Sequence, residues 1–195
     1  MSRVIRLNRP GGVERLEVTD VTVPAPGPGE IRLRHLAIGV NFVDVYQRTG
    51  LYPLPAFPAV LGIEGSGVVE AIGPDVAEVA VGDRVAYAGA PVGAYATDRI
   101  LPASRAVKVP ASLSDEAAAT ALARGLTAHM LETRVFAVGP QTVALIHSAA
   151  GGLGTLLVRW AKRRGARVIG TVGSAAKAEL ARAAGADHVI VGRDA

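Results

Sequence analysis

The fold is decided by one stretch of the chain, Thr142–Thr171, which reads TVALIHSAAGGLGTLLVRWAKRRGARVIGT. It begins with an apolar run and turns at Ala149–Gly154, after which leucines and a tryptophan follow at helical spacing. A second apolar run, Val168–Val172, comes after Gly165, a residue type that commonly ends helices. The stretch therefore predicts a strand, a glycine turn, a helix and a second strand within about 30 residues, which is the context of a dinucleotide-binding turn.

Glycine has a separate role at each point of this turn. Gly151 allows the backbone to approach a pyrophosphate, Gly154 allows the helix to pack on the strand, and the free N–H groups at the helix start face the anion. Ala149 stands at the first glycine of the usual pattern. A tight turn without any ligand also favours glycine, so a purely structural turn is the alternative. The surrounding order of strand, helix and strand favours the cofactor site.

The end of the second strand indicates which dinucleotide is bound. NAD sites usually place Asp or Glu there to bind the ribose 2′-hydroxyl, whereas this chain reads VGSAAK over Val172–Lys177. Ser174, the amides of a new helix and Lys177 would instead hold a 2′-phosphate. The sequence therefore predicts NADPH as the cofactor. In the alternative interpretation, Ser174 only caps the helix and Lys177 is a solvated surface residue.

The composition narrows the class of protein. The chain has 195 residues, of which 50% are hydrophobic and 4% aromatic, a net charge of +4 and no cysteine. Disulfides and thiolate metal sites are therefore excluded. The positive residues are scattered, which does not indicate a nucleic-acid patch. No apolar stretch is long enough to cross a bilayer, and the amino terminus lacks the core of a signal peptide. We expect no membrane partner and a cytoplasmic protein.

Short β-rich runs separated by Gly and Pro occupy the chain up to about Pro110. They predict an antiparallel, partly open β-barrel domain. The expected strands are Val4–Leu7, Leu16–Thr19, Ile31–Ile38, Gly67–Ile72, Arg84–Tyr87 and Ala94–Leu101. A short helix is expected over Asn41–Gly50. The predicted domains are residues 1–115 and residues 116–195.

A long amphipathic helix is expected to begin at Ser114. Its candidates for burial are Ala117, Ala118, Leu122, Leu126 and Met130. After the glycine turn and its two strands, the sequence predicts a helix over Ser174–Ala184 and a third strand over His188–Val191. Three parallel strands form about half of a dinucleotide-binding sheet, so we expect one edge of this sheet to be bare.

Six motifs in this order resemble the medium-chain dehydrogenase/reductase superfamily, and within it the zinc-free quinone oxidoreductases related to zeta-crystallin. They are GVNFVDVY (Gly39–Tyr46), RTGLYP (Arg48–Pro53), LGIEGSGVV (Leu61–Val69), VGDRV (Val81–Val85), GLTA (Gly125–Ala128) and AAGGLG (Ala149–Gly154). The resemblance covers the whole chain. It implies a fold of class α/β and β, with a GroES-like, partly open β-barrel domain followed by an incomplete Rossmann-type parallel sheet.

The residues that bind zinc in the alcohol dehydrogenases of this superfamily have no counterparts here. Those enzymes use a cysteine near the present Asn41 and a histidine in a Gly-His-Glu motif, which reads Gly62-Ile63-Glu64 in this chain. The four cysteines of the structural zinc lobe are also absent. We therefore predict no metal. Without a Lewis acid, electron-poor acceptors such as quinones or enones are favoured over alcohols.

The resemblance implies roles for named residues. The nicotinamide side of the cofactor would be lined by Asn41, Phe42, Val43, Asp44, Val45, Tyr46 and Thr127. The phosphates would be held by Gly152, Leu153, Gly173, Ser174 and Lys177, beside Gly151. Tyr46 and Tyr52 are candidates to lie against a flat acceptor ring. Two alternatives stay open: both tyrosines simply pack between domains, and Asn41 is only a helix cap.

Two departures from the family concern the end of the chain. Gly192 stands where relatives often carry an aromatic residue against the adenosine phosphate, and Arg193 would compensate by its charge. Relatives also continue beyond the third strand, so the resemblance implies that the chain is truncated in the cofactor domain. Many relatives are dimers that pair through the edge of the cofactor sheet. A homodimer is therefore expected for a full-length relative but not for this chain.

The leading prediction is an NADPH-dependent quinone oxidoreductase, or its amino-terminal portion, that transfers hydride without zinc. The first alternative is an NADPH-dependent enone or enoyl reductase of the same architecture. The second is a truncated relative without turnover that binds a nucleotide or RNA, although no basic platform with interleaved aromatic residues supports it.

Overall fold

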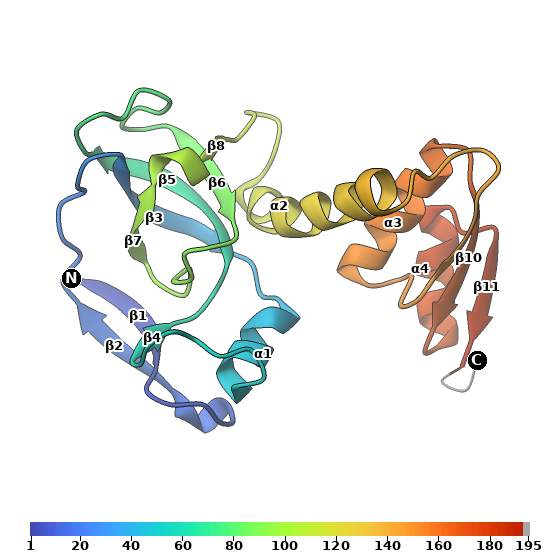
Figure 1. The fold of residues 1–195 in the computed structure, drawn as a ribbon, viewed down its shortest axis with the longest axis horizontal. Helices are drawn as coiled ribbons and strands as arrows, with labels where there is room; N and C mark the ends of the chain where they lie inside the picture. Colours follow the sequence, from blue (N-terminus) through green and yellow to red (C-terminus); the bar gives the residue numbers. More distant parts are fainter. Residues whose placement is uncertain (193–195) are drawn as a thin grey trace. The chain divides into compact units, whose positions relative to one another are not determined.

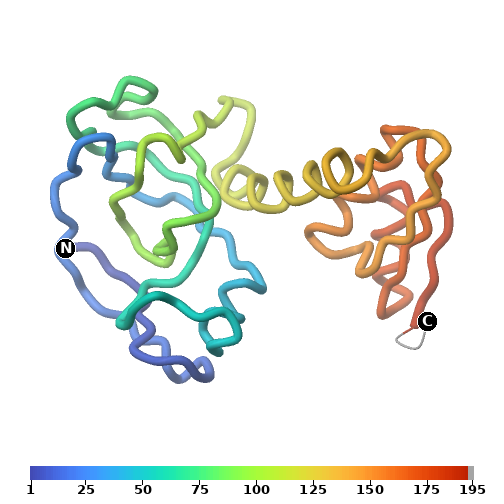
Figure 2. Tube along the Cα trace, in the orientation of Figure 1, coloured from blue at the N-terminus to red at the C-terminus, as the bar shows by residue number. Residues whose placement is uncertain are grey.

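The computed structural model describes residues 1–192, and the chain divides into two compact units. The first unit is Met1–Ala123 and the second is Arg124–Ala195. The division falls inside helix α2 (Asp115–Met130), so this helix contributes residues to both units. Figure 1 labels the elements, and Figure 2 allows the path of the chain to be followed from end to end.

The first unit is built from two antiparallel sheets, ordered β7-β3-β5-β6-β8 and β2-β1-β4 (Figure 1). Its core lies against the larger sheet and includes Ile31, Leu33, Val69 and Leu101. A bridge between Val4 and Ala96 joins strand β1 to the segment before β7. The elements are β1 (Ser2–Leu7), η1 (Val13–Arg15), β2 (Leu16–Val21), β3 (Glu30–Ile38), α1 (Phe42–Thr49), β4 (Ala59–Val60), β5 (Glu64–Ile72), β6 (Arg84–Ala88), β7 (Asp98–Pro102), η2 (Ala103–Arg105) and β8 (Val107–Lys108).

The second unit is a three-stranded parallel sheet, ordered β11-β10-β9, with helices α3 and α4 packed on one face (Figure 1). The buried face carries alternate residues such as Ile146, Val168 and Val172, whereas Val143 and Leu145 on the other face are exposed. Its elements after α2 are the π-helix η3 (Leu131–Val135), β9 (Val143–Ile146), α3 (Gly152–Arg163), β10 (Arg167–Val172), α4 (Ala175–Ala184) and β11 (His188–Val191).

The structure confirms the predicted order of strand, glycine turn, helix and strand, the third strand, and a β-rich first part. Two predicted strands are wrong in their starts, because β5 begins at Glu64 and not at Gly67, and β7 begins at Asp98 and not at Ala94. The residues before β7 leave the ladder and cross to β1 through Ala96. Strands β4 and β8 were not predicted, since two residues carry too little pattern.

The predicted burial along α2 is partly wrong. Ala118 is buried as expected, but Ala117, Leu126 and Met130 are exposed, and Leu126 is 61% exposed. Alanines supply the buried side of this helix, namely Ala118, Ala119 and Ala128. Because alanine recurs all around the helix, its apolar periodicity is weak and does not identify the buried face. No helix among residues 1–192 is both long enough and apolar enough to span a membrane.

Candidate functional site

The glycine turn after β9 is tightly wound. Ser148 has a φ of 52°, and its carbonyl oxygen accepts a hydrogen bond of 2.8 Å from the Gly151 N–H group. A Cβ atom at Gly154 would overlap that same oxygen and lie 2.9 Å from Cα of Ala149. The predicted packing role of Gly154 is therefore confirmed, because only glycine lets α3 approach the strand so closely.

Ala149 takes the place of the usual first glycine because the neighbouring strand β10 provides the room. The Ala149 side chain is fully buried, and a Cβ atom at Gly170 on β10 would lie only 2.7 Å from the Cβ atom of Ala149. Gly170 thus leaves the space that Ala149 fills. The imperfect match to the glycine pattern is compensated within the fold.

A small pocket of about 120 Å³ lies between the glycine turn and the start of α4. It is lined by Ser148, Ala150, Gly151, Val172, Gly173 and Lys177. The pocket brings together three predicted site residues from two separate turns, and none of its lining residues is a carboxylate. It therefore suits an anionic group rather than a ribose hydroxyl that needs an acceptor.

The three remaining residues of the phosphate prediction, Gly152, Leu153 and Ser174, lie at the starts of helices. Ser174 is the N-cap of α4, and its hydroxyl oxygen accepts the N–H of Lys177 at 3.4 Å. The capping role of Ser174 is thus present in the structure and leaves the N–H groups at the start of α4 oriented toward the turn. Gly152 and Leu153 form the first residues of α3.

The charge of the second unit favours anions. From Arg124 to Ala195 the sequence holds ten Lys and Arg residues but four Asp and Glu residues. The three acidic residues among those that the structure describes all lie beside cations, namely Glu132 with Arg164 at 3.7 Å, Asp187 with Lys162 at 2.7 Å and Glu179 with Arg182 at 2.6 Å. Within residues 124–192, no carboxylate pairs with Lys177, which leaves its charge for a ligand.

In the first unit, the predicted residues Asn41–Tyr46 form the start of α1. The Asp44 carboxylate accepts the Asn41 N–H group at 2.8 Å and the Tyr95 hydroxyl at 2.9 Å. Asp44 is buried, and burial raises its pKa, although both hydrogen bonds act in the opposite direction. Burial and the Asp44 charge together raise the pKa of Tyr95. This arrangement keeps the Tyr95 proton in place and fixes the first turn of α1.

Glu64 holds the side chain of Asn41. The carboxylate of Glu64 is fully buried and accepts the Asn41 Nδ2 group at 2.8 Å and the Ala123 N–H group of α2 at 3.2 Å. A Cβ atom at Gly39 would collide with this carboxylate, lying 2.7 Å from its Cδ atom. Glu64 thus has a structural role, and the side chain that it holds is that of a predicted cofactor residue.

Three aromatic rings gather at α1. The centroids of Phe42 and Tyr46 are 6.3 Å apart, and those of Tyr46 and Tyr52 are 5.3 Å apart. Phe42 is 78% exposed and Tyr52 is 52% exposed. The structure thus brings together the two tyrosines named as candidates to contact a flat acceptor. Val43 is half-buried and Val45 exposed on the same helix, while Thr127 lies on α2 in the second unit.

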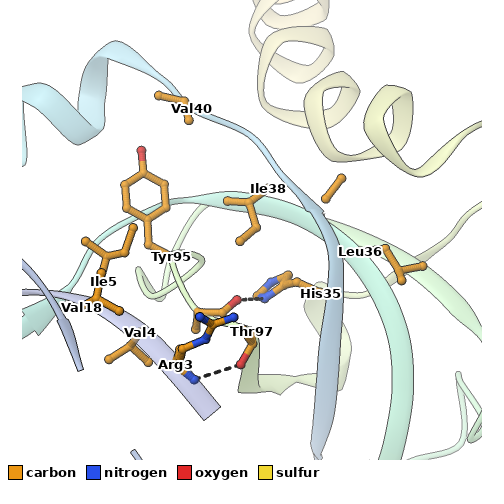
Figure 3. Close-up of a pocket in the computed structure, with 12 residues that line it drawn as sticks. Arg3, Val4, Ile5, Val18, His35, Leu36, Ile38, Val40, Tyr95 and Thr97 are labelled. Atoms are coloured by element: carbon orange, nitrogen blue, oxygen red, sulfur yellow. Dashed lines mark hydrogen bonds between the residues drawn. The ribbon is translucent and has the colours of Figure 1, made fainter. Parts of the chain in front are cut away.

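A larger, apolar cavity of the first unit lies elsewhere. It has a volume of about 590 Å³ and runs between β1, β3 and the segment before β7, with Ile5, Ile38 and Tyr95 in its walls (Figure 3). His35 also lines it and contacts the Ala96 carbonyl and the Tyr87 hydroxyl, each at 2.7 Å. Burial lowers the pKa of His35 to about 4, so the ring is neutral at neutral pH.

Among residues 1–192, no three His, Asp or Glu side chains lie close enough together to hold a metal ion. Two contacts that organise α1 could not be found from the sequence, namely that of Tyr95 with Asp44 and that of Glu64 with Asn41, because both join distant segments. Arg193, which was expected to compensate for Gly192, lies outside the described residues.

Comparison with known proteins supports this picture. Residues 27–111 match the alcohol dehydrogenase GroES-like domain, and residues 152–195 match the model described as zinc-binding dehydrogenase. A quinone oxidoreductase of Pseudomonas aeruginosa is 45% identical over 190 residues, which are 97% of this chain and 58% of the relative. A 2-haloacrylate reductase of Burkholderia is 43% identical over 94% of this chain and 57% of the relative.

The same family is found among solved structures. The Escherichia coli quinone oxidoreductase complexed with NADPH has a TM-score of 0.93 and 42% identity, over 97% of this chain and 58% of that protein. The chain thus spans a little over half the length of the relatives it matches. The predicted fold class, a GroES-like domain followed by part of a Rossmann-type parallel sheet, is confirmed. Over almost its whole length the chain is thus similar to quinone oxidoreductases, and its two parts match the alcohol dehydrogenase GroES-like and zinc-binding dehydrogenase domains.

Proposed function

We propose that the chain binds NADPH and serves hydride transfer to a quinone without zinc. The observation that carries the proposal is the pocket lined by Gly151, Gly173 and Lys177, which has a cation and no carboxylate where the 2′ position of the adenosine ribose is expected. The relatives named quinone oxidoreductase, one of them solved with NADPH, agree with it.

The residues present fit this cofactor. The turn at Gly151, Gly152 and Leu153 would receive the pyrophosphate on the free N–H groups of α3. Gly173, the start of α4 capped by Ser174, and Lys177 would receive the 2′-phosphate. When bound, NADPH supplies a hydride from C4 of its nicotinamide ring. The excess of positive charge in the second unit favours all three phosphates.

For the nicotinamide end we assign Asn41, Phe42, Val43, Asp44, Val45, Tyr46 and Thr127. Glu64 and Asp44 fix the first turn of α1, so that the assigned residues of this helix are held in place before any ligand arrives. Tyr46 and Tyr52 present a pair of rings suited to a flat acceptor, and a tyrosine hydroxyl would donate to the carbonyl oxygen that gains charge. We assign residues 1–115 to substrate binding and residues 116–195 to the cofactor.

A second function is supported by one comparison. The Burkholderia relative, named a 2-haloacrylate reductase, is almost as similar to this chain as the quinone oxidoreductases are. Reduction of an α,β-unsaturated acid or ketone needs the same hydride donor and no metal. Both substrates also carry a carbonyl conjugated with a double bond, so the site described above suits either.

Turnover distinguishes the two functions. NADPH oxidation would be measured with 1,4-benzoquinone and with an α,β-unsaturated ketone at equal concentrations. We expect a higher kcat/KM for the quinone, and a clear preference for the enone would overturn the substrate assignment. A cytoplasmic location, and the absence of a homodimer for this chain, also stay predictions.

A further inference from the structure

Arg124 lies directly against the glycine turn. A methyl group at Gly152, the first residue of α3, would be 2.8 Å from the Cζ and Nη1 atoms of Arg124. The guanidinium group therefore occupies the space that a side chain at Gly152 would fill. Both residues belong to the second unit, and Gly151, the N-cap of α3, borders the pocket that Lys177 also lines.

Within the described part of the chain, this guanidinium has no acidic partner. Among residues 1–192, no carboxylate lies within ion-pair distance of Arg124, because the three described acids of its unit pair with Lys162, Arg164 and Arg182. The start of a helix is itself the positive end of the helix dipole. A cation placed there is electrostatically unfavourable unless an anion comes between the two positive groups.

We propose that Arg124 binds the pyrophosphate of the dinucleotide, an inference that rests on the proposed function. A guanidinium presents two parallel N–H groups that match the oxygens of a phosphate, and the free amides of α3 complete the set of donors. Arg124 and Lys177 differ in the part of the dinucleotide that each would contact. Arg124 lies at the first glycine turn, where the pyrophosphate binds, whereas Lys177 follows β10, where the ribose 2′ position lies.

The two cations therefore have separable effects on affinity. Both NADPH and NADH carry the pyrophosphate, but only NADPH carries the 2′-phosphate. Arg124→Gln should weaken both nucleotides by the same factor, tenfold or more, as expected for the loss of a charge-assisted contact. Lys177→Gln should weaken NADPH alone. Arg124→Lys, which keeps the charge but loses the paired geometry, should lie between the unchanged chain and Arg124→Gln.

The test is a set of Kd values for NADPH and NADH, measured by calorimetry on the whole 195-residue chain and its variants. Arg159→Gln is the matched control, because Arg159 is an exposed arginine on α3, two turns beyond Gly152 and without an ion-pair partner among residues 1–192. It removes the same charge and should leave both Kd values within twofold. Circular dichroism tests whether each variant is folded. If Arg124→Gln does not fold, the Kd values of Arg124→Lys decide the outcome.

Each result has one meaning. Equal weakening of both nucleotides by Arg124→Gln, but not by Arg159→Gln, supports the inference. If Arg124→Gln binds both nucleotides as tightly as the unchanged chain while Lys177→Gln loses NADPH, the role of Arg124 is refuted and the proposed function stands. If the unchanged chain binds neither nucleotide, the proposed function fails and the inference falls with it.

Discussion

The glycine turn offers a paired test in which the same substitution should have opposite effects at two helical positions. Gly154 in α3 and Gly125 in α2 both lie in helices of the second unit. A Cβ atom at Gly125 would meet no atom within 4 Å, whereas one at Gly154 would overlap the Ser148 carbonyl oxygen. Each glycine would be replaced by alanine in turn.

The expected magnitudes follow from this difference in space. Alanine in an open helical position stabilises the helix by about 1 kcal/mol relative to glycine, so Gly125→Ala should raise the free energy of unfolding by that amount. At Gly154 the backbone of Ser148 must move, and overpacking of this kind costs about 1–3 kcal/mol. The two variants should therefore differ by about 2 kcal/mol or more, which is roughly 10 °C in Tm for a unit of this size.

Unfolding of the second unit can be followed separately by tryptophan fluorescence. Trp160 is the only tryptophan of the chain and lies in α3, so its fluorescence reports on the second unit. Gly154→Ala should also lower NADPH affinity about tenfold, since the Ser148 oxygen that must move accepts the Gly151 N–H group. If Gly154→Ala proves as stable as Gly125→Ala and keeps its NADPH affinity, the reasoning about this turn is refuted.

Three further predictions concern single residues. Lys177→Glu should raise the Kd for NADPH at least tenfold more than that for NADH, and an equal change in both, or no change, would contradict the 2′-phosphate role. Glu64→Ala removes the carboxylate that accepts from the Asn41 amide and the Ala123 N–H group, and it should lower the free energy of unfolding by about 2 kcal/mol or more. Glu64→Gln keeps an acceptor oxygen and should lose less. Equal losses for the two variants in denaturant melts would argue against these contacts. Burial holds the pKa of His35 at about 4, below its ordinary value of 6.5, so the unfolded chain binds a proton at this residue at a higher pH than the folded chain does. The contribution of neutral His35 to the free energy of unfolding is therefore complete above pH 6.5. Up to about 3 kcal/mol of it is lost as the pH falls from 6.5 to 4. His35→Gln should remove this part of the pH dependence, and an unchanged pH profile in the variant would count against it.

The local part of the fold was predictable from the sequence because its signals lie within a few residues of one another. Ile146 and the glycines after it, the helical spacing of the next segment and Gly165 define strand, turn and helix without any distant contact. The same holds for the cap of α4 at Ser174, whose hydroxyl binds the N–H group three residues later. Such patterns report secondary structure directly.

The contacts that position the candidate site were not predictable, since they join residues far apart in the chain. Asn41 and Glu64 are separated by 23 positions, and Asp44 and Tyr95 by 51. No periodicity links such pairs. The contact between Arg124 and Gly152 likewise depends on how α2 passes the glycine turn. The buried side of α2 was misjudged for a different reason, because its alanines leave no clear apolar stripe.

Everything proposed for this chain requires that its second unit hold a phosphate-bearing dinucleotide at the glycine turn and Lys177. The most direct test is calorimetric titration of the 195-residue chain with NADPH and, separately, with NADH. We expect saturable binding of NADPH with one site per chain and a Kd at least tenfold lower than that for NADH. No binding of NADPH, or tighter binding of NADH, would contradict it.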